Sequence, residues 1–459
     1  MPAPVAAKPN SPLTGVSWLG WTGAFHRRIV PAVPDLSPTI LPILRSHRLP
    51  ELDLGTEAIH PHYTGLSILN LAASMERWFG LPVGPHAPLA IEALTSIATD
   101  ARQIVVCLLD SLSFTRFTGW LDGPGRALQP LVADGLLAPL TSVVPSTTTS
   151  ALTSLWTGLS PAEHGILGYE LLLREYGLIA NMINFGPAAL DNQRGLLERA
   201  GVRPQTLLPL PTLGTRLTQA RIEAHAFVGN TIRNSGLSRM HYADATLHGF
   251  GSPADLWHSL RQLVESPTST RRFVWAYYSG VDALSHVYGP DSDLVRAEYE
   301  FFVRAMIDLF VQPLDRSVGR EVLLVLLADH GQVATTIQPH YQLAQHPGLA
   351  RRLHLSPTGE ARLAYLYLRP GQAAAVDEYV ERAWPGAFTR LESDHALGAG
   401  LFGPGTPNEK AASRLGDVVL ISRGPAYLWW SDKPDTLLGR HGSLTPEEML
   451  VPLLAARLG

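Results

Sequence analysis

The stretch that decides the fold is Ile104-Val-Val-Cys-Leu-Leu109, which is followed at once by an acidic residue, Asp110. A continuous apolar run of this length is typical of a strand buried on both faces of a parallel sheet. Comparable runs occupy residues 140–144, 273–278 and 322–327, and segments of helical periodicity lie between them, at 150–156, 252–265 and 294–310. Strands alternating with helices predict a doubly wound α/β fold, with a mostly parallel sheet and helices on both faces.

The chain has 459 residues, of which 46% are apolar, enough for one large domain or a few smaller ones. Residues 1–100 are predicted to form an arm, Pro-rich to about residue 15, and a helical segment with helical spacing from Gly65 to Trp78. Residues 101–459 are predicted to form the main domain. Small α+β insertions are expected at about 171–250 and 355–438; their predicted elements are a strand at 224–228, a strand at 363–368, a helix at 373–383 and a hairpin-like pair at 418–421 and 426–430.

Several classes of protein are disfavoured by composition. The formal net charge is −4 and no Lys/Arg run exceeds a pair, so the basic stripe expected of a nucleic-acid-binding protein is missing. The longest apolar runs are only strand-length, which argues against a membrane span. The first residues contain no apolar stretch of a secretory signal, so we expect a cytoplasmic protein. The single cysteine, Cys107, lies inside the apolar run and is interpreted as a buried hydrophobe.

Polar residues follow two of the predicted strands where each strand ends. Asp110 directly follows its run, and Asp329 follows residues 322–327 within two positions. Ligands of open α/β sheets gather beyond the carboxyl ends of the strands, so these two acids are expected in one site. In isolation, Asp110 is equally well explained as the N-cap of the next helix. His330 can share a metal with Asp329 only if the chain turns there, which Gly331 permits.

Two further groups have spacings suited to a metal ion. Asp282 and His286 are four residues apart, which places both on one face of a helix, although an Asp–His salt pair would have the same spacing. His441 lies between glycines in Gly439-Arg-His-Gly-Ser443, as either a ligand or a turn residue. His60 and His62 form a His-x-His pair around Pro61, for which a loop or packing role is favoured.

A hydroxyl-rich turn, Pro145-Ser-Thr-Thr-Thr-Ser150, precedes a helical pattern. The N-terminus of a helix offers free N–H groups and the positive end of the dipole, which favour a phosphate or an alkoxide. Composition does not choose among Thr147, Thr148 and Thr149, and ordinary capping explains any one of them. Carboxylates, imidazoles and a hydroxyl together suit zinc or a similar ion, whereas magnesium prefers oxygen ligands. If they converge, the set predicts two adjacent divalent ions that stabilise an in-line displacement at phosphorus.

With these residues in view, the chain resembles the alkaline phosphatase superfamily, and most closely its branch of type I phosphodiesterases and nucleotide pyrophosphatases. The resemblance runs from about Gln103 to Leu458 and is carried by five motifs, the second with a downstream signature: the apolar run ending in Asp110, Pro145-Ser-Thr-Thr with Thr157-Gly-Leu-Ser-Pro-Ala-Glu-His-Gly165, Asp282-x-x-x-His286-x-x-Gly-Pro, Asp329-His330-Gly331 and His441-Gly442.

The resemblance implies that residues 101–459 are a catalytic domain with two divalent metal ions, zinc or alternatively manganese. One ion would take Asp282, His286 and His441. The other would take the remaining ligands, namely Asp110, Asp329, His330 and the Thr148 oxygen. Counting back nine residues from Thr157 makes Thr148 the nucleophile, which would form a phosphothreonine intermediate.

Departures from the family pattern limit this assignment. The nucleotide-hydrolysing relatives carry an Asn after the His-Gly signature, but the corresponding stretch here is Ile166-Leu-Gly-Tyr-Glu170, where Tyr169 is the candidate to donate to a phosphate oxygen. No Lys or Arg that would select a phosphomonoester dianion is evident. The expected function is therefore a phosphodiesterase or pyrophosphatase acting on small phosphate esters. The alternatives are a phosphomonoesterase, a phosphonate hydrolase and an inactive binding relative.

Candidate aromatic walls for the substrate pocket are Tyr169, Tyr277, Tyr278 and Trp430. Nothing in the sequence indicates the oligomeric state.

Overall fold

The computed structural model describes residues 35–189 and 193–459. Its large sheet has the strand order β2-β16-β9-β1-β8-β6-β7, and only β16 runs antiparallel to its neighbours. The predicted runs form three adjacent central strands, buried throughout, as expected for a doubly wound sheet. The strands are β1 (Gln103–Leu109), β2 (Leu136–Thr141), β6 (Glu223–Gly229), β7 (Thr246–Phe250), β8 (Arg272–Tyr278), β9 (Val322–Leu327) and β16 (Leu450–Arg457).

The prediction at 140–144 was displaced along the chain, because β2 ends at Thr141. Its partner β16 pairs Leu450 with Thr141, so the ladder stops there and the following residues leave the sheet toward the next helix. A short helical turn directly precedes the last strand. That turn is α20 (Pro446–Met449), and Pro452 lies inside β16, opposite Pro139.

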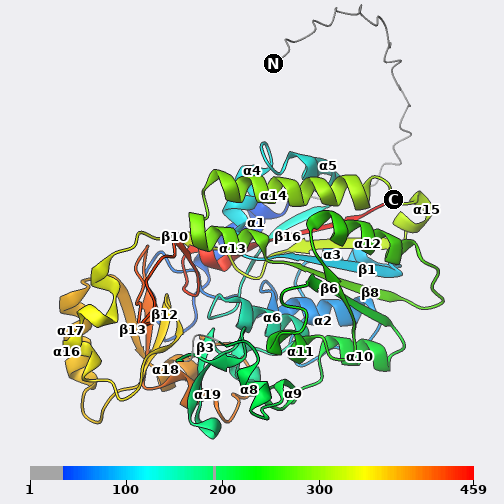
Figure 1. The fold of residues 1–459 in the computed structure, drawn as a ribbon. Helices are drawn as coiled ribbons and strands as arrows, with labels where there is room; N and C mark the ends of the chain where they lie inside the picture. Colours follow the sequence, from blue (N-terminus) through cyan, green and yellow to red (C-terminus); the bar gives the residue numbers. More distant parts are fainter. Residues whose placement is uncertain (1–34, 190–192) are drawn as a thin grey trace, which may run out of the picture. The chain divides into compact units, whose positions relative to one another are not determined.

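Helices cover both faces of the large sheet (Figure 1). One face carries α2 (Leu69–Trp78), α6 (Thr148–Thr157) and α10 (Leu213–Gln219), and the other carries α4 (Phe114–Trp120), α5 (Gln129–Asp134) and α14 (Asp293–Met306). The other helices of six or more residues are α1 (Ser37–Ser46), α3 (Glu92–Ala98), α11 (Gly236–His241), α12 (Pro253–Glu265), α13 (Gly280–Tyr288), α17 (Ala373–Ala383) and α18 (Ser393–Gly398). No helix within 35–189 or 193–459 is long and apolar enough to cross a bilayer.

The predicted N-terminal segment is described only from residue 35, and the Pro-rich arm lies outside the described residues. Residues 35–100 pack on the edge strand β2: the Leu36 amide donates to the Leu137 carbonyl at 2.9 Å, and the Ile68 amide donates to the Thr141 carbonyl at 2.9 Å. His60, from the His-x-His pair, is buried and accepts the Leu49 amide at its Nδ1. This contact agrees with a packing role for that histidine.

A second, antiparallel sheet has the order β13-β14-β12-β11-β3-β4-β5. It combines residues from both predicted insertions: β3 (Glu170–Leu173), β4 (Leu178–Asn181) and β5 (Gly186–Pro187) with β11 (Thr358–Glu360), β12 (Leu363–Leu366), β13 (Phe388–Glu392) and β14 (Val418–Ser422). The range 171–250 therefore divides between the sheets, since β6 and β7 extend the large one. The predicted hairpin was wrong: β14 pairs with β12 and β13, and residues 426–430 form no strand.

Candidate metal centre and nucleophile

The six predicted metal ligands and Thr148 follow strands at one edge of the large sheet or beside it, whereas Tyr169 directly precedes β3 of the second sheet. Asp110 follows β1, Asp329 and His330 follow β9, and α13 carries Asp282 and His286 directly after β8. Thr148 is the first residue of α6, after β2. His441 follows the short strand β15 (Gly439–Arg440), which pairs with β10 (Val333–Ala334). Because β1, β2, β8 and β9 are parallel, their carboxyl ends meet at the same edge.

The structure gathers the six carboxylate and imidazole side chains into two groups of three. Asp282, His286 and His441 form one group, and Asp110, Asp329 and His330 form the other. Within each group, one ligand atom per residue lies within 4.8 Å of the others. This division is the one that the resemblance implied.

The two groups adjoin each other. The His441 Nε2 is 3.9 Å from the Asp282 Oδ1 within the first group, and the rings of His441 and His330 stack across the groups with centroids 4.0 Å apart. The Thr148 hydroxyl is 3.2 Å from the His330 Nε2. All seven residues that the sequence singled out therefore converge.

The three consecutive threonines have different surroundings. The Thr147 hydroxyl donates to the Glu360 Oε1 at 2.6 Å, and the Thr149 hydroxyl is buried without a hydrogen-bond partner among the described residues. Thr148 alone of the three directs its hydroxyl at the cluster of charged residues. The geometry thus separates three residues that composition did not distinguish.

All three histidines are held by main-chain carbonyl groups. The Nδ1 of His286 lies 2.8 Å from the Gly439 carbonyl, that of His330 lies 3.1 Å from the Gly331 carbonyl, and that of His441 lies 3.2 Å from the Ser146 carbonyl. A carbonyl only accepts hydrogen bonds, so each Nδ1 carries the proton and each Nε2 presents a lone pair to the cluster. A ring N–H bonded to a backbone carbonyl is the usual support of a metal-binding histidine.

The carboxylates are also oriented by neighbouring groups. The Tyr277 hydroxyl donates to the Asp110 Oδ2, the Ser111 amide donates to the Asp329 Oδ1, and the Gln332 side chain donates to the Asp282 Oδ1 at 2.6 Å. The remaining oxygens Asp110 Oδ1 and Asp329 Oδ2 are buried and have no hydrogen-bond partner among the described residues. Buried carboxylate oxygens are rarely left unpaired, because desolvation without compensation is costly.

The pKa values reflect this concentration of buried charge. Burial, with the nearby charges of Asp329 and Asp282, raises the pKa of Asp110 well above its usual range. Burial also raises the pKa of Asp329. For Asp282, burial acts in the same direction but is outweighed by His286 and the other imidazoles, so its pKa is lowered. Burial and the neighbouring histidines lower the pKa of His441.

These residues fit divalent cations. Three imidazole lone pairs, two unpartnered carboxylate oxygens and a hydroxyl all face one small volume, and no lysine or arginine is among the principal charged neighbours of Asp110, Asp282 or Asp329. A cation in each group would satisfy the unpartnered oxygens and offset the repulsion between the acids. Mixed nitrogen and oxygen donors suit zinc and similar ions.

Gly331 is needed because the loop packs closely at this position, and not because its backbone is left-handed. A Cβ atom at this position would lie 2.0 Å from the Glu447 carbonyl oxygen, and the Gly331 amide donates to the Glu448 carbonyl at 2.8 Å. The glycine therefore lets the loop that carries Asp329 and His330 pack directly against α20.

The four aromatic candidates for the pocket wall have distinct contacts. Tyr277 orients Asp110, and the Tyr278 hydroxyl donates to Glu298. The Trp430 indole N–H donates to the Glu170 Oε2 at 3.0 Å. The Tyr169 amide donates to the Glu360 Oε1 at 2.9 Å, and burial raises the pKa of the Tyr169 hydroxyl.

Sequence reasoning missed Gln332 and Glu360. Gln332 is two residues beyond His330 in the same loop, so its proximity to the site could have been noticed. Glu360 belongs to the second sheet and meets Thr147 across 213 residues, which no local pattern indicates.

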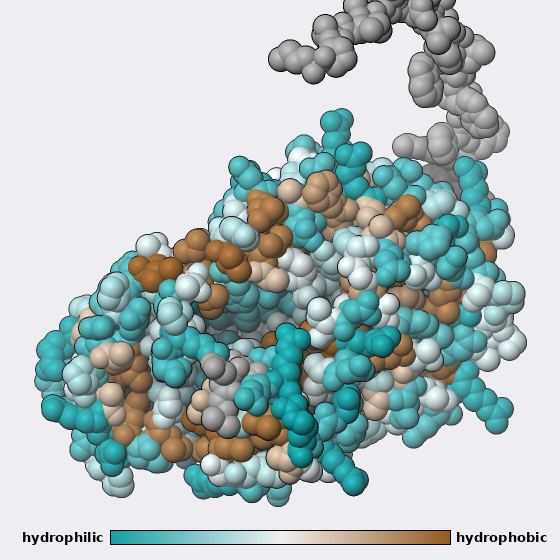
Figure 2. Space-filling model, viewed as in Figure 1, coloured by the Kyte–Doolittle hydropathy of each residue, from teal (hydrophilic) through white to brown (hydrophobic). Residues whose placement is uncertain are grey.

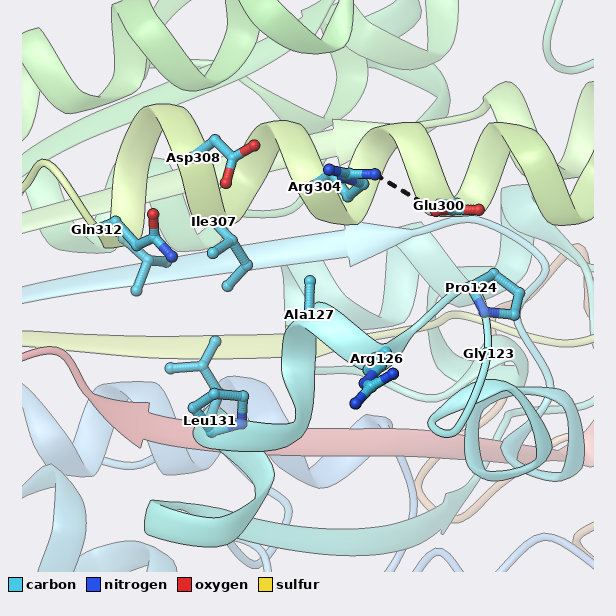
Figure 3. A pocket seen from close by; sticks show the side chains of 12 residues that line it. Gly123, Pro124, Arg126, Ala127, Leu131, Glu300, Arg304, Ile307, Asp308 and Gln312 are labelled. Atoms are coloured by element: carbon cyan, nitrogen blue, oxygen red, sulfur yellow. Dashed lines mark ion pairs between the residues drawn. The ribbon is translucent and has the colours of Figure 1, made fainter. Parts of the chain in front are cut away.

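A space-filling view shows the molecule hollowed between the elements of the two sheets (Figure 2). A separate cavity of about 510 Å³ lies between α14 with the following turn Ile307–Val311 and the segment 123–131 (Figure 3). It is lined by Arg126, Leu131 and Ile307, and by Arg304 with its ion-pair partner Glu300. None of the predicted site residues lines this cavity.

Comparison with known proteins identifies the family. The family model of type I phosphodiesterase / nucleotide pyrophosphatase matches residues 104–444, which include all seven site residues. The chain belongs to this family. It is therefore a hydrolase of the alkaline phosphatase superfamily that acts on phosphate esters. No curated protein sequence matches the chain significantly.

Solved structures share the fold at low sequence identity. An inactive variant of murine ectonucleotide pyrophosphatase / phosphodiesterase 5 in complex with AMP is 16% identical with a TM-score of 0.56, covering 77% of this chain and 87% of that chain. Phosphonoacetate hydrolase from Sinorhizobium meliloti, in complex with phosphonoformate, is 19% identical with a TM-score of 0.56, covering 78% and 90%. These similarities confirm the α/β fold class.

Proposed function

We propose that this protein is a phosphodiesterase or pyrophosphatase that uses Thr148 as its nucleophile and two divalent metal ions. The proposal is carried by one observation: the Thr148 hydroxyl lies 3.2 Å from the His330 Nε2, where the two groups of ligands adjoin. Of the six charged residues, Asp282, His286 and His441 would hold one ion. The other three, Asp110, Asp329 and His330, would hold the second together with the Thr148 oxygen.

When bound, the ions supply Lewis-acid stabilisation of the charge that develops on the attacking and leaving oxygens. The Thr148 oxygen attacks phosphorus; a Thr148–phosphorus bond forms while the bond to the leaving alkoxide or phosphate breaks. Thr148 is the first residue of the ten-residue helix α6, whose free N–H groups and dipole favour negative charge on that oxygen. Water then attacks the phosphothreonine, which releases the second product and restores the hydroxyl.

Zinc is the ion that the donor set favours, with manganese as the alternative. The substrate would be a small phosphate ester; a phosphonate or a phosphomonoester is the competing possibility within the same superfamily. A cytoplasmic location remains the expectation from the sequence.

The decisive experiment combines metal analysis with a nucleophile variant. The purified protein should contain about two equivalents of divalent metal. It should cleave bis(p-nitrophenyl) phosphate, and a chelator should abolish that activity. Thr148→Ala should lose on the order of 10³-fold or more in kcat and still bind metal, because six of the seven ligands remain. Thr148→Ser, which keeps a hydroxyl at the same place, is the matched control and should retain part of the activity.

An active Thr148→Ala variant would exclude Thr148 as the nucleophile. A protein without bound metal and without activity on any of a diester, a monoester, a pyrophosphate and a phosphonate would instead favour the inactive binding relative.

A further inference from the structure

Glu360 joins the second sheet to the candidate site. It is the last residue of β11 and is only 9% exposed. Its Oε1 accepts the Thr147 hydroxyl at 2.6 Å and the Tyr169 amide at 2.9 Å. A Cβ atom on Gly442, which has a φ of +122°, would lie 2.7 Å from the Glu360 Cβ. The Glu360 side chain therefore contacts the Thr147 hydroxyl and the Tyr169 amide and packs closely against Gly442, the residue after His441.

The second carboxylate oxygen of Glu360 is free. Its Oε2 has no hydrogen-bond partner among the described residues, and it is not one of the unpartnered oxygens that are fully enclosed. The Glu360 carboxyl group thus has one oxygen without a hydrogen bond to any described residue, and its other oxygen binds Thr147, the neighbour of the proposed nucleophile. This placement is unusual for a nearly buried acid, because such groups normally have both oxygens satisfied.

Within the described residues, no lysine or arginine near Glu360 offsets the charge of its carboxylate. Its principal charged neighbours are His286 and Glu170. The buried arginines of nearby segments are paired elsewhere, Arg362 with Glu448 and Arg440 with Asp435. Apart from metal ions, an ionised Glu360 would thus present a phosphate group with an extra negative charge, and no arginine or lysine is among these principal neighbours.

We propose that Glu360 is a specificity-determining residue that disfavours dianionic phosphomonoesters relative to monoanionic phosphodiesters. The inference rests on the proposed function, since it concerns the substrate of that same site. An ionised carboxylate bonded to Thr147, the neighbour of Thr148, repels a second negative charge on a phosphoryl group that Thr148 attacks, and selectivity built on such repulsion is a common device. The same charge would disfavour phosphonates that carry an additional carboxylate.

The alternative is that Glu360 only positions Thr147 and Tyr169. Burial raises the pKa of Glu360 to about 8, although the bonds from Thr147 and Tyr169 act in the opposite direction. At pH 9 most of the group is ionised, so the charge is present when the two explanations are compared. Glu360→Gln keeps the acceptor oxygen for both hydrogen bonds and removes only the charge.

The test compares p-nitrophenyl phosphate with methyl p-nitrophenyl phosphate, which share a leaving group, on the metal-loaded full chain at pH 9. Glu360→Gln should raise the monoester-to-diester ratio of kcat/KM by about tenfold or more, mainly through a lower KM for the monoester. A ratio within about twofold of wild type would overturn the proposal. The ratio does not depend on the fraction of active enzyme, so partial misfolding does not obscure the result.

Two controls sharpen the outcome. Thr147→Val removes one hydrogen bond to Glu360 but keeps its charge, so activity on both substrates should fall together. Glu170→Gln removes a neighbouring charge that is held by Trp430, and it should change the ratio less than Glu360→Gln does. If Glu170→Gln changed the monoester-to-diester ratio as much as Glu360→Gln does, the selectivity would come from the combined negative charge of the region and not from Glu360 in particular. Wild-type diesterase activity that depends on Thr148, with no effect of Glu360→Gln, would refute this inference alone.

Discussion

The two sheets contribute to the site in different ways. The large sheet and its loops supply all six charged ligand candidates and Thr148, from the ends of parallel strands and the elements that follow them. The second sheet supplies Glu360, which accepts hydrogen bonds from Thr147 and from the Tyr169 amide and belongs to neither ligand group. Under the proposed function, the large sheet would therefore carry the reaction chemistry, whereas Glu360 of the second sheet would help to select among substrates. Changes on the first should abolish activity, and changes on the second should redistribute it.

The largest effect is expected from a ligand of the large sheet. Asp329→Ala removes a buried carboxylate whose Oδ2 has no other partner, so the affected group should lose its ion. Metal content should fall from about two equivalents to about one, and kcat on a diester should drop by on the order of 10³-fold or more. Elemental analysis and steady-state kinetics check both numbers. Unchanged metal content would remove Asp329 from the ligand set.

A smaller effect is expected for a residue that supports a metal ligand by a hydrogen bond but is not a ligand itself. Gln332→Leu removes the donor to the Asp282 Oδ1 and keeps a side chain of similar size. Loss of such a supporting hydrogen bond typically costs about 10–100-fold in metal affinity or activity. Titration with chelator should show the weakening at the Asp282 group, and Gln332→Glu, which cannot donate when ionised, should behave alike. Wild-type affinity in both variants would contradict this role.

A further effect concerns the pH dependence of stability in metal-free protein. Because burial raises the pKa of Glu360 to about 8 in the folded state, folded protein keeps a proton that the unfolded chain releases. The stabilisation is fully present below the unfolded value of about 4.5 and is lost as pH rises toward 8. Relative to Glu360→Gln, wild type should lose up to about 1.4 kcal/mol per pH unit across that window. Urea unfolding at several pH values measures the difference, and parallel curves for the two proteins would rule out a buried, proton-binding Glu360.

The fold and the ligand groups were predictable because their signals are local. The apolar runs at 104–109, 273–278 and 322–327 are typical of doubly buried strands, and in a parallel sheet the polar residues that follow such strands share an edge. The second sheet was not predictable as one unit, because it joins β3–β5 to strands almost 200 residues later. The failed hairpin at 418–430 has the same cause: β14 pairs with distant β12 and β13, and tertiary packing overrides the local pattern.

The roles of Glu360 and Gln332 were not predicted, because each makes a hydrogen bond to a residue far away in the sequence. Gln332 reaches back across 50 residues to Asp282, and Glu360 reaches across 213 residues to Thr147. The choice of Thr148 over its neighbours likewise needed the resemblance, since helix capping fits all three threonines. Only the different partners of the three hydroxyls separate them physically.

The orientation of the three imidazole rings is set by hydrogen bonds to the main chain. Gly439, Gly331 and Ser146 each offer a carbonyl group, which every amino acid possesses. Replacing a flanking side chain therefore leaves the proton on Nδ1 wherever the loop path is preserved. The protein can accumulate substitutions around its reactive centre while the tautomers stay fixed, which leaves the substrate-facing surface free to diverge.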